Sequence, residues 1–547
     1  MAFTEASLWV PQVRARIFGG PVTVAGGTKA SGQIDFQARG EAQPAALGPL
    51  FDHPLRRSLA GSAPYTATVS LRNGLQRVAV DSSLRGVTST LPPPFEKAAA
   101  ETLPLHVDFV PGESGATQRI GVTLGRVAAA ELTRRRQGDA MQLQRGSIGF
   151  GPVAGQALRQ PERRGILVYG SLASFDADRW RALMGDDKGE TLPTVLELRI
   201  GRLDVSGKRI NNLALRGSVD AAGWAATVDA DEIAGQLNYT RQAGGKLTAR
   251  LLQFTVPESL DKEKRASTAK PSDLPAVDLV AERFTLRGKP LGRVELVGQK
   301  SGSDWRIDRL AILNSDATFL GTGRWRDGVV TTSELEFQLD VAEVGQFMSR
   351  VGYPRTVMGG KADMQGALRW NGELTSLDYP SLAGDLKMKA EDGEFLEIDP
   401  GLGKLISLMN LQALPRRIAL DFRDVFSKGF RFDRIEANAR LDRGVMDISE
   451  FRMRGPAAEV VTSGKVDLAS ETQDLRVRVV PSLGGSAATA VAIVNPVAGV
   501  AAAVAQQILK NPLGQIFAAE FSVSGGWAEP KVARLFTPAA PNPIAQP

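Results

Sequence analysis

Apolar and polar residues alternate with a period of two in many short segments of this sequence. Successive side chains of a β-strand point to opposite faces, so this alternation predicts strands with one apolar and one polar face. The clearest segments carry Leu196, Leu198 and Ile200; Leu335, Phe337 and Leu339; Phe422, Phe430 and Phe432; and Leu475, Val477 and Val479 at their apolar positions. We therefore expect a mainly β protein, an elongated and curved antiparallel sheet of consecutive hairpins.

Turn and helix signals divide the strands. The predicted tight turns are Asn73-Gly74, Asp327-Gly328, Asn371-Gly372 and Asp392-Gly393. Helical spacing is confined to four segments: Ser174–Met184 with Ser174 as N-cap, Ala342–Val351, Leu402–Leu411 and Ala487–Lys510. Because the predicted helices are so few, the sequence does not indicate which elements would pack over the apolar face of the sheet.

One hairpin pattern occurs twice. The apolar positions from Trp305 to Trp325 match those from Met446 to Val466 at a constant offset of 141 positions, and Gly323 coincides with Gly464. A shorter echo runs from Trp224 to Gly235. The match favours repeated hairpin units that each contact mainly their neighbours. The alternative is that any two amphipathic hairpins align this well.

Composition shifts predict five segments. We expect a β-groove region over 1–260, a charged linker or loop over 261–275, and a second β region over 276–480. An apolar helical element over 481–513 and a final strand with a tail over 514–547 complete the chain. The linker is the best candidate boundary because Asp261–Arg265 is entirely charged and lies between Pro257 and Pro275.

Composition narrows the class of protein. Apolar residues make up 43% of the 547 residues and aromatic residues 6%, so the apolar faces are mainly aliphatic. The net charge is only +6, and the run Arg134–Arg136 is interpreted as a solvated turn, so no nucleic-acid partner is expected. The chain has no cysteine, which excludes disulfides and thiolate metal sites. Its N-terminus lacks the pattern of a signal peptide, and we expect that the chain begins within a longer protein.

Catalytic and metal-binding patterns are missing from the sequence. His53 and His106 lie far apart without partners at ligand spacing, and Asp186-Asp187 is interpreted as a solvated turn. The segment Gly149–Pro152 has a proline where a phosphate-binding helix would begin, so it is interpreted as a turn. No enzymatic activity, cofactor or metal is predicted.

The apolar face of the sheet can be removed from water in two ways. Two sheets can bury their apolar faces against each other in a closed sandwich. Alternatively, one curved sheet can leave an apolar trough that holds acyl chains, which gain about 0.8 kcal/mol per buried CH₂. From the residues alone the closed sandwich is the favoured interpretation, although the scarcity of helices that could cover the sheet leans slightly toward the trough. In that case the twelve apolar residues named above line it.

An uncharged segment of 31 residues runs from Val479 to Leu509. It is long enough to span a bilayer, but Asn495-Pro496 interrupts it and alanine and valine dominate it. Two interpretations stay open: an element in or on a membrane surface, or a helix that closes the end of the β-body. The candidates for membrane contact are Ile493, Val497, Val500, Val504 and Ile508.

Two stretches resemble a known family. Ser83–Val87, Leu91–Lys97 and Leu103–Leu105 resemble the S-x-L-x-G, L-P-x-P-x-x-K and P-L element of the YhdP family of AsmA-like envelope proteins. The block Asp421–Asp433, continued through Gly455–Ala458 to Gly464–Leu468, resembles the AsmA-type C-terminal module. Because the two stretches lie more than three hundred residues apart, the resemblance covers essentially the whole chain.

The resemblance implies a function as well as a fold. It implies a repeating β-groove protein of the periplasm, anchored in the inner membrane through a segment absent from this chain. Its ligand would be phospholipid, carried between the inner and outer membranes of a Gram-negative envelope. The second hypothesis is a non-catalytic envelope scaffold or assembly factor with a closed β-sandwich body, and a hydrolase of envelope lipids is a distant third. Protein partners are not identified.

Overall fold

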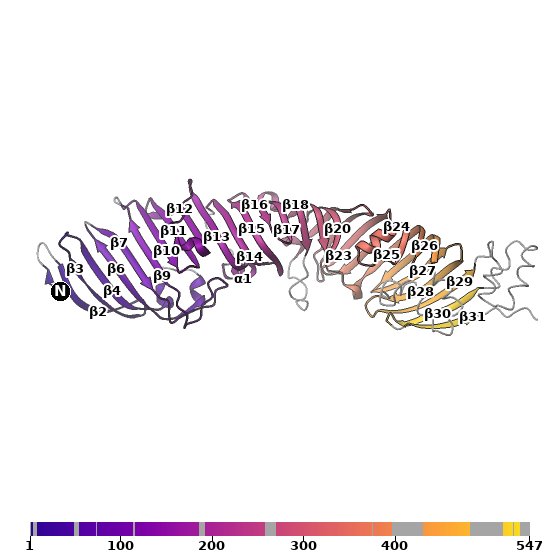
Figure 1. The fold of residues 1–547 in the computed structure, drawn as a ribbon, viewed down its shortest axis with the longest axis horizontal. Helices are drawn as coiled ribbons and strands as arrows, with labels where there is room; N and C mark the ends of the chain where they lie inside the picture. Colours follow the sequence, from indigo (N-terminus) through magenta and orange to yellow (C-terminus); the bar gives the residue numbers. More distant parts are fainter. Residues whose placement is uncertain are drawn as a thin grey trace, which may run out of the picture. The chain divides into compact units, whose positions relative to one another are not determined.

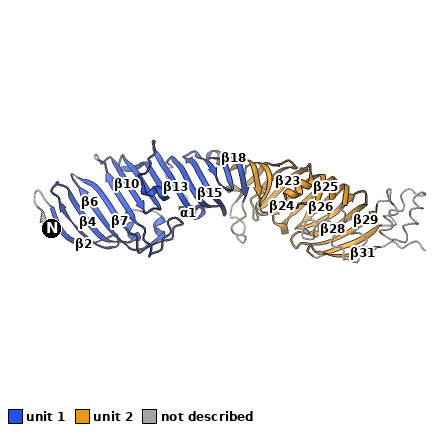
Figure 2. Cartoon of the chain, in the orientation of Figure 1, with its two compact units in different colours: residues 1–263 blue, residues 264–547 orange. Residues whose placement is uncertain are grey.

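The chain folds into two compact units, residues 1–263 and 264–547, in a computed structural model (Figure 2). The structure describes residues 2–3, 8–48, 54–72, 74–112, 115–184, 192–256, 270–374, 376–396, 430–481, 518–528 and 530–536. The division between the units falls inside the range 261–275 that the sequence analysis interprets as a linker. The wider division into five segments stays a prediction.

The first unit is a sheet of many strands with one α-helix among its described residues (Figure 1). Its elements are β1 (Ala2–Phe3), β2 (Leu8–Ile17), β3 (Gly20–Thr28), β4 (Ile34–Ala42), β5 (Leu59–Gly61), β6 (Ala63–Leu71), β7 (Leu75–Ser82), β8 (Val87–Ser89), β9 (Leu105–Pro111), β10 (Thr117–Leu124), β11 (Ala128–Gln137), β12 (Ala140–Phe150), β13 (Gly165–Asp176), α1 (Ala177–Met184), β14 (Thr194–Val205), β15 (Lys208–Val219), β16 (Gly223–Asp229), β17 (Ile233–Thr240) and β18 (Lys246–Val256). β5 and β8 form a small sheet of their own.

The second unit has the same construction in its described part. Its elements are β19 (Ala276–Leu286), β20 (Lys289–Ser301), β21 (Asp304–Leu313), β22 (Ala317–Arg326), β23 (Thr332–Val341), α2 (Val344–Arg350), β24 (Val357–Asn371), β25 (Ala383–Phe395), β26 (Phe430–Asp442), β27 (Val445–Arg454), β28 (Ala458–Asp467), β29 (Thr472–Pro481), β30 (Ala519–Gly526) and β31 (Lys531–Phe536). The prediction of a mainly β fold built from consecutive hairpins is confirmed.

Strand pairing follows chain order, with one departure from the expected antiparallel pattern. β13 pairs in parallel with both β12 and β14. Parallel neighbours need a connection that returns to the starting end, and α1 lies in the connection between β13 and β14. The strongly alternating sequence of β14 carries no signal for this change of direction.

The helix predictions are partly confirmed. α2 lies within the predicted range Ala342–Val351, but Ser174 does not cap a helix because it lies inside β13. The N–H of Arg179 donates instead to the Asp176 carboxylate at 2.9 Å, which satisfies a free amide at the start of α1. The helices predicted at 402–411 and 487–510 lie outside the described residues.

The turn predicted at Asp392-Gly393 is wrong, because both residues lie inside β25. Asp392 has a positive φ of 55°, so the strand is locally irregular there without reversing. A Cβ at Gly393 would collide with the ring of Phe432 on the neighbouring strand. Gly393 therefore does not form a turn. It leaves space for the ring of Phe432.

The register supports the proposed repeat. The pairing of β21 with β22 shifts between Ile307 and Leu310, and the pairing of β27 with β28 shifts between Ile448 and Phe451. These shifts lie at equivalent positions of the 141-residue offset. A shared β-bulge is a specific feature that simple alternation does not require, so it favours a true repeated hairpin.

A buried ion pair joins the turn between β21 and β22 to α2. The Asp316 side chain is fully buried and accepts hydrogen bonds from Nε of Arg350 at 2.5 Å and from Nη2 at 3.0 Å. The carbonyl of Asp316 also accepts the N–H of Ala342 at 2.8 Å. Hydrogen bonding from Arg350 lowers the pKa of Asp316 below its ordinary value.

We expect Asp316→Ala to destabilise α2 and the start of β22 locally by about 3 kcal/mol, because it leaves the mostly buried Arg350 without its carboxylate partner. Hydrogen exchange of the α2 amides measures this change. The depressed pKa means that the contribution is present above pH of about 4 and is lost as the pH falls through the folded-state pKa. The control is Arg434→Ala, which breaks an exposed pair with Glu391 and should cost below about 1 kcal/mol. Equal effects of the two variants would contradict the prediction.

A buried lysine stabilises the motif that runs from Ser83 to Lys97. The ammonium of Lys97, which is 6% exposed, donates to the carbonyls of Val87 at 2.8 Å and Ala98 at 2.9 Å. The ring of Phe95 lies 6.4 Å from that of Phe150 in β12 and 5.8 Å from that of Trp180 in α1. The motif is therefore anchored both to itself and to the main sheet.

Lys97→Met should destabilise this loop by about 2 kcal/mol, because the carbonyl of Val87, in a buried contact, and that of the exposed Ala98 both lose a charged donor. Faster hydrogen exchange at residues 87–89 and easier proteolysis near residue 97 are the expected results. Lys29→Met is the matched control, since Lys29 is 61% exposed. Unchanged exchange in the Lys97 variant would show that the packing of Phe95 alone holds the loop.

Candidate functional site

The first unit carries a continuous apolar face. Reading residues that lie directly opposite one another across β4, β6, β7, β9, β10 and β11 gives the row Phe36, Val69, Val78, Phe109, Ile120 and Leu132. We call it the Phe36–Leu132 row. All six side chains are half-buried. An unbroken strip of half-buried apolar side chains therefore crosses six neighbouring strands, whose order can be followed in Figure 1.

The predicted residues of β14 continue this face. Leu196 lies opposite Val168 of β13, and Leu198 lies opposite Leu215 of β15. Both leucines are half-buried, whereas Ile200 is 4% exposed and belongs to a buried cluster with Leu172 and Leu213. The register thus brings all three predicted residues to the apolar face. Ile200 lies where this face is buried by neighbouring side chains.

The second unit repeats the arrangement. One row contains Phe319, Leu339, Met364, Met388, Ala437, Phe451, Thr462, Val477 and Phe521. The row beside it contains Phe337, Leu386, Ile448, Leu475 and Val523, with glycines or alanine between them. The predicted residues of β23 and β29 therefore lie on one face of one sheet.

Exposure changes along this face. Leu335, Phe337 and Leu339 are half-buried on β23. In contrast, Phe430, Phe432, Leu475, Val477 and Val479 are between 1% and 8% exposed and belong to one large core cluster. The apolar face keeps half-buried positions around β22–β25 and is packed as a closed core across β26–β31, a core that also includes Val357 and Trp370 of β24 and Ala390 of β25.

Aromatic rings and glycines shape the accessible part. Phe337 and Phe319 stack with their centroids 5.6 Å apart. A Cβ at Gly366, directly opposite Phe337, would lie 2.5 Å from the Phe337 ring. The missing side chain at Gly366 thus lets the ring lie flat over the next strand and keeps the surface smooth.

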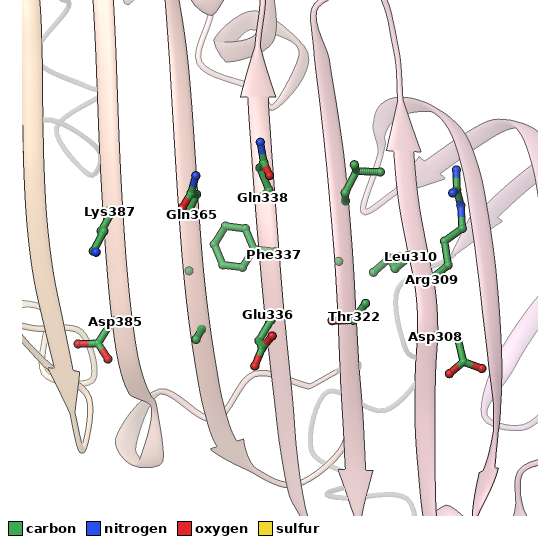
Figure 3. Close-up of a pocket in the computed structure, with 14 residues that line it drawn as sticks. Asp308, Arg309, Leu310, Thr322, Glu336, Phe337, Gln338, Gln365, Asp385 and Lys387 are labelled. Atoms are coloured by element: carbon green, nitrogen blue, oxygen red, sulfur yellow. The ribbon is translucent and has the colours of Figure 1, made fainter.

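The polar face of the second unit has its own hollow of about 610 Å³ (Figure 3). Its lining includes the side chains of Glu336, Gln338, Gln365, Asp385 and Lys387 from three adjacent strands. The alternation of β23 places Glu336 and Gln338 on the face opposite the Phe337 side chain. Phe337 nevertheless also lines the hollow (Figure 3), between Gly321 and Gly366, which lie opposite it on the neighbouring strands and have no side chains. No sequence signal distinguishes this hollow, because charged outward positions are typical of any exposed strand.

The other residues singled out from the sequence lie partly outside and partly inside the described residues. Phe422, His53 and the membrane-contact candidates Ile493, Val497, Val500, Val504 and Ile508 lie outside the described residues. His106 lies on β9, half-exposed, with Nδ1 2.7 Å from Asp81. In the part of the chain that the structure describes, no cluster of three or more metal-ligating side chains occurs. Within the same described ranges, no helix is both long and apolar enough to cross a membrane.

The interpretation of Arg134–Arg136 as a turn is wrong. The three residues lie in β11, paired with β10 and with β12. A bulge in β12 opposite this point keeps the two strands paired as far as Gln137. The polar sequence concealed a strand because arginine carries no strand preference of its own.

Comparison with known proteins agrees with these features. The intermembrane phospholipid transporter YhdP of Escherichia coli (strain K12) is 24% identical over an alignment of 584 residues. The alignment covers 97% of this chain and 43% of that protein, so the chain spans less than half the length of this relative. The family model described as YhdP protein matches residues 1–532. Because that match extends over nearly the entire sequence, the chain belongs to the YhdP family.

Proposed function

We propose that this chain binds phospholipid on the apolar faces of its sheets and takes part in moving it between membranes. The observation that carries the proposal is the unbroken apolar register, which crosses six strands in the Phe36–Leu132 row. An acyl chain on such a surface gains about 0.8 kcal/mol per buried CH₂. The printed name of the E. coli relative, an intermembrane phospholipid transporter, supports the same ligand.

The half-buried positions are the proposed contacts for acyl chains. They are Leu196, Leu198, Leu335, Phe337 and Leu339, together with the Phe36–Leu132 row. Ile200, Phe430, Phe432, Leu475, Val477 and Val479 lie in packed cores, so lipid reaches them only where the core opens. Phe422 remains a sequence-based candidate.

Movement of lipid along the apolar face requires no catalysed reaction. Neighbouring positions of a row offer an acyl chain nearly equal apolar contact, so lipid can exchange passively along it. The proposed location is the periplasm, with the inner and outer membranes as the two ends of the path. The proposal includes no enzymatic step and no cofactor.

The closed core across β26–β31 favours a second role for that part. A sheet that buries its own apolar face to 9% exposure or less at most positions is a stable spacer rather than a lipid surface. An envelope scaffold is therefore the alternative function, and lipid loading distinguishes the two.

Phe337→Asp should abolish lipid loading at β23, because it places a charge on the apolar face where an acyl chain would lie. Lipid that co-purifies with the full chain, measured by native mass spectrometry, should fall several-fold. Gln338→Asp is the matched control, since it adds the same charge on the opposite face of the same strand and should leave loading unchanged.

Circular dichroism of both variants separates loading from folding. A folded Phe337 variant that carries as much lipid as the wild type would refute the trough, as would a wild-type chain that carries none. An unfolded variant would instead support the closed sandwich.

The uncharged segment near the C-terminus is proposed to contact a membrane. Deletion of residues 487–509 should remove binding of the chain to anionic liposomes in a flotation assay, because it removes the candidates Ile493 to Ile508. Replacing the same segment with a Gly/Ser linker of equal length is the control for spacing. Liposome binding that persists after deletion would favour an end-closing role.

A further inference from the structure

The apolar face of the first unit ends in two arginines. On β11, Ala128, Ala130 and Leu132 occupy alternate positions, and Arg134 and Arg136 occupy the next two. The pairing of β10 with β11 has no shift, and Gln118 lies opposite Arg134 just as Ile120 lies opposite Leu132. Arg134 and Arg136 therefore share the face of Leu132, whereas Arg135 lies on the polar face.

The surrounding positions on this face carry no charge. They are Leu105, Val107, Phe109 and Pro111 on β9, Gln118, Ile120, Val122 and Leu124 on β10, and Met141, Leu143, Gly146, Ile148 and Phe150 on β12. The two guanidinium groups thus stand at the margin of an apolar surface, beside one neutral amide. A solvated strand end would not need to place its arginines on the apolar side.

The arginines keep donors free for a ligand. Nη2 of Arg134 donates to the carbonyl of Met141 at 3.1 Å, which holds this half-buried side chain along β12. Among the described residues, no carboxylate forms an ion pair with Arg134 or Arg136. Glu131, the nearest acidic residue on β11, belongs to the opposite face because it is an odd number of positions away.

We propose that Arg134 and Arg136 bind the phosphate group of a phospholipid whose acyl chains lie on the Phe36–Leu132 row. The inference rests on the proposed function and adds the position of the headgroup. Alternate strand residues lie about 7 Å apart, so two guanidinium groups can approach one phosphate from both sides. The row extends about 24 Å from Leu132, five strand spacings of about 4.8 Å, which accommodates an extended acyl chain.

The chemistry of recognition is that of arginine and phosphate. A planar guanidinium donates two parallel hydrogen bonds to phosphate oxygens, and these charge-assisted bonds are stronger beside an apolar surface than in water. The same groups could bind a soluble phosphate. A lipid differs because its chains contribute burial on the adjacent row.

The test measures binding of the full chain to fluorescent phosphatidylglycerol and to fluorescent diacylglycerol, which lacks the phosphate. The double variant Arg134→Gln/Arg136→Gln should bind phosphatidylglycerol about tenfold or more weakly and diacylglycerol as well as the wild type does. Arg135→Gln, which removes one arginine charge from the other face of the strand, should change neither affinity. Arg134→Lys/Arg136→Lys should retain an intermediate affinity and shows that the strand tolerates substitution.

Each outcome separates the site from the proposed function. Equal affinity of the double variant and the wild type for phosphatidylglycerol overturns the headgroup site. A wild type that binds neither lipid overturns the proposed function instead. Glycerol 3-phosphate is the third ligand: if it binds the wild type as tightly as phosphatidylglycerol does, the site is one for soluble phosphate, and the lipid assignment is overturned.

Discussion

Strand register is the constraint on which the rest of this structure depends. A shift of one residue between two strands moves every apolar side chain to the opposite face. Here the register preserves the apolar face across strand after strand, through Val69 and Val78 in the first unit and through Leu339 and Met364 in the second. Where a bulge interrupts the pairing, as at Ile448 and Phe451, the alternation resumes on the same face.

The apolar face performs two different physical tasks. In β26–β31 it is packed into a core with Phe432 and Met453 almost fully buried, which gives this part its stability. Around β22–β25 and along the Phe36–Leu132 row, the same alternation leaves side chains half-buried. A half-buried strip has apolar area still in contact with water, and a lipid that covers it gains the corresponding free energy. Function in this protein is therefore proposed where packing is incomplete.

Polar residues limit and support this surface. Asp316 with Arg350 joins α2 to the turn between β21 and β22, and Lys97 ties the Ser83–Lys97 motif to itself. Both are charged groups with all or most of their surface buried, and both are satisfied by specific partners. Their role is positional, whereas the arginines of β11 retain donors and face the apolar strip. The structural charges use their hydrogen bonds within the protein, whereas the arginines proposed to bind phosphate keep donors available.

The sequence by itself determined most of the strands, their two faces and the family. Period-two alternation such as that of Leu196, Leu198 and Ile200 is a local property of the sequence, so it predicts a strand without any knowledge of the tertiary contacts. The tertiary structure alone decided the parallel pairing of β13, the strand at Arg134–Arg136, and the full burial of Val477 where Leu339 in the same row stays half-buried. These properties depend on which strands become neighbours and on how closely they pack. Such contacts join residues far apart in the chain, and local alternation carries no information about them.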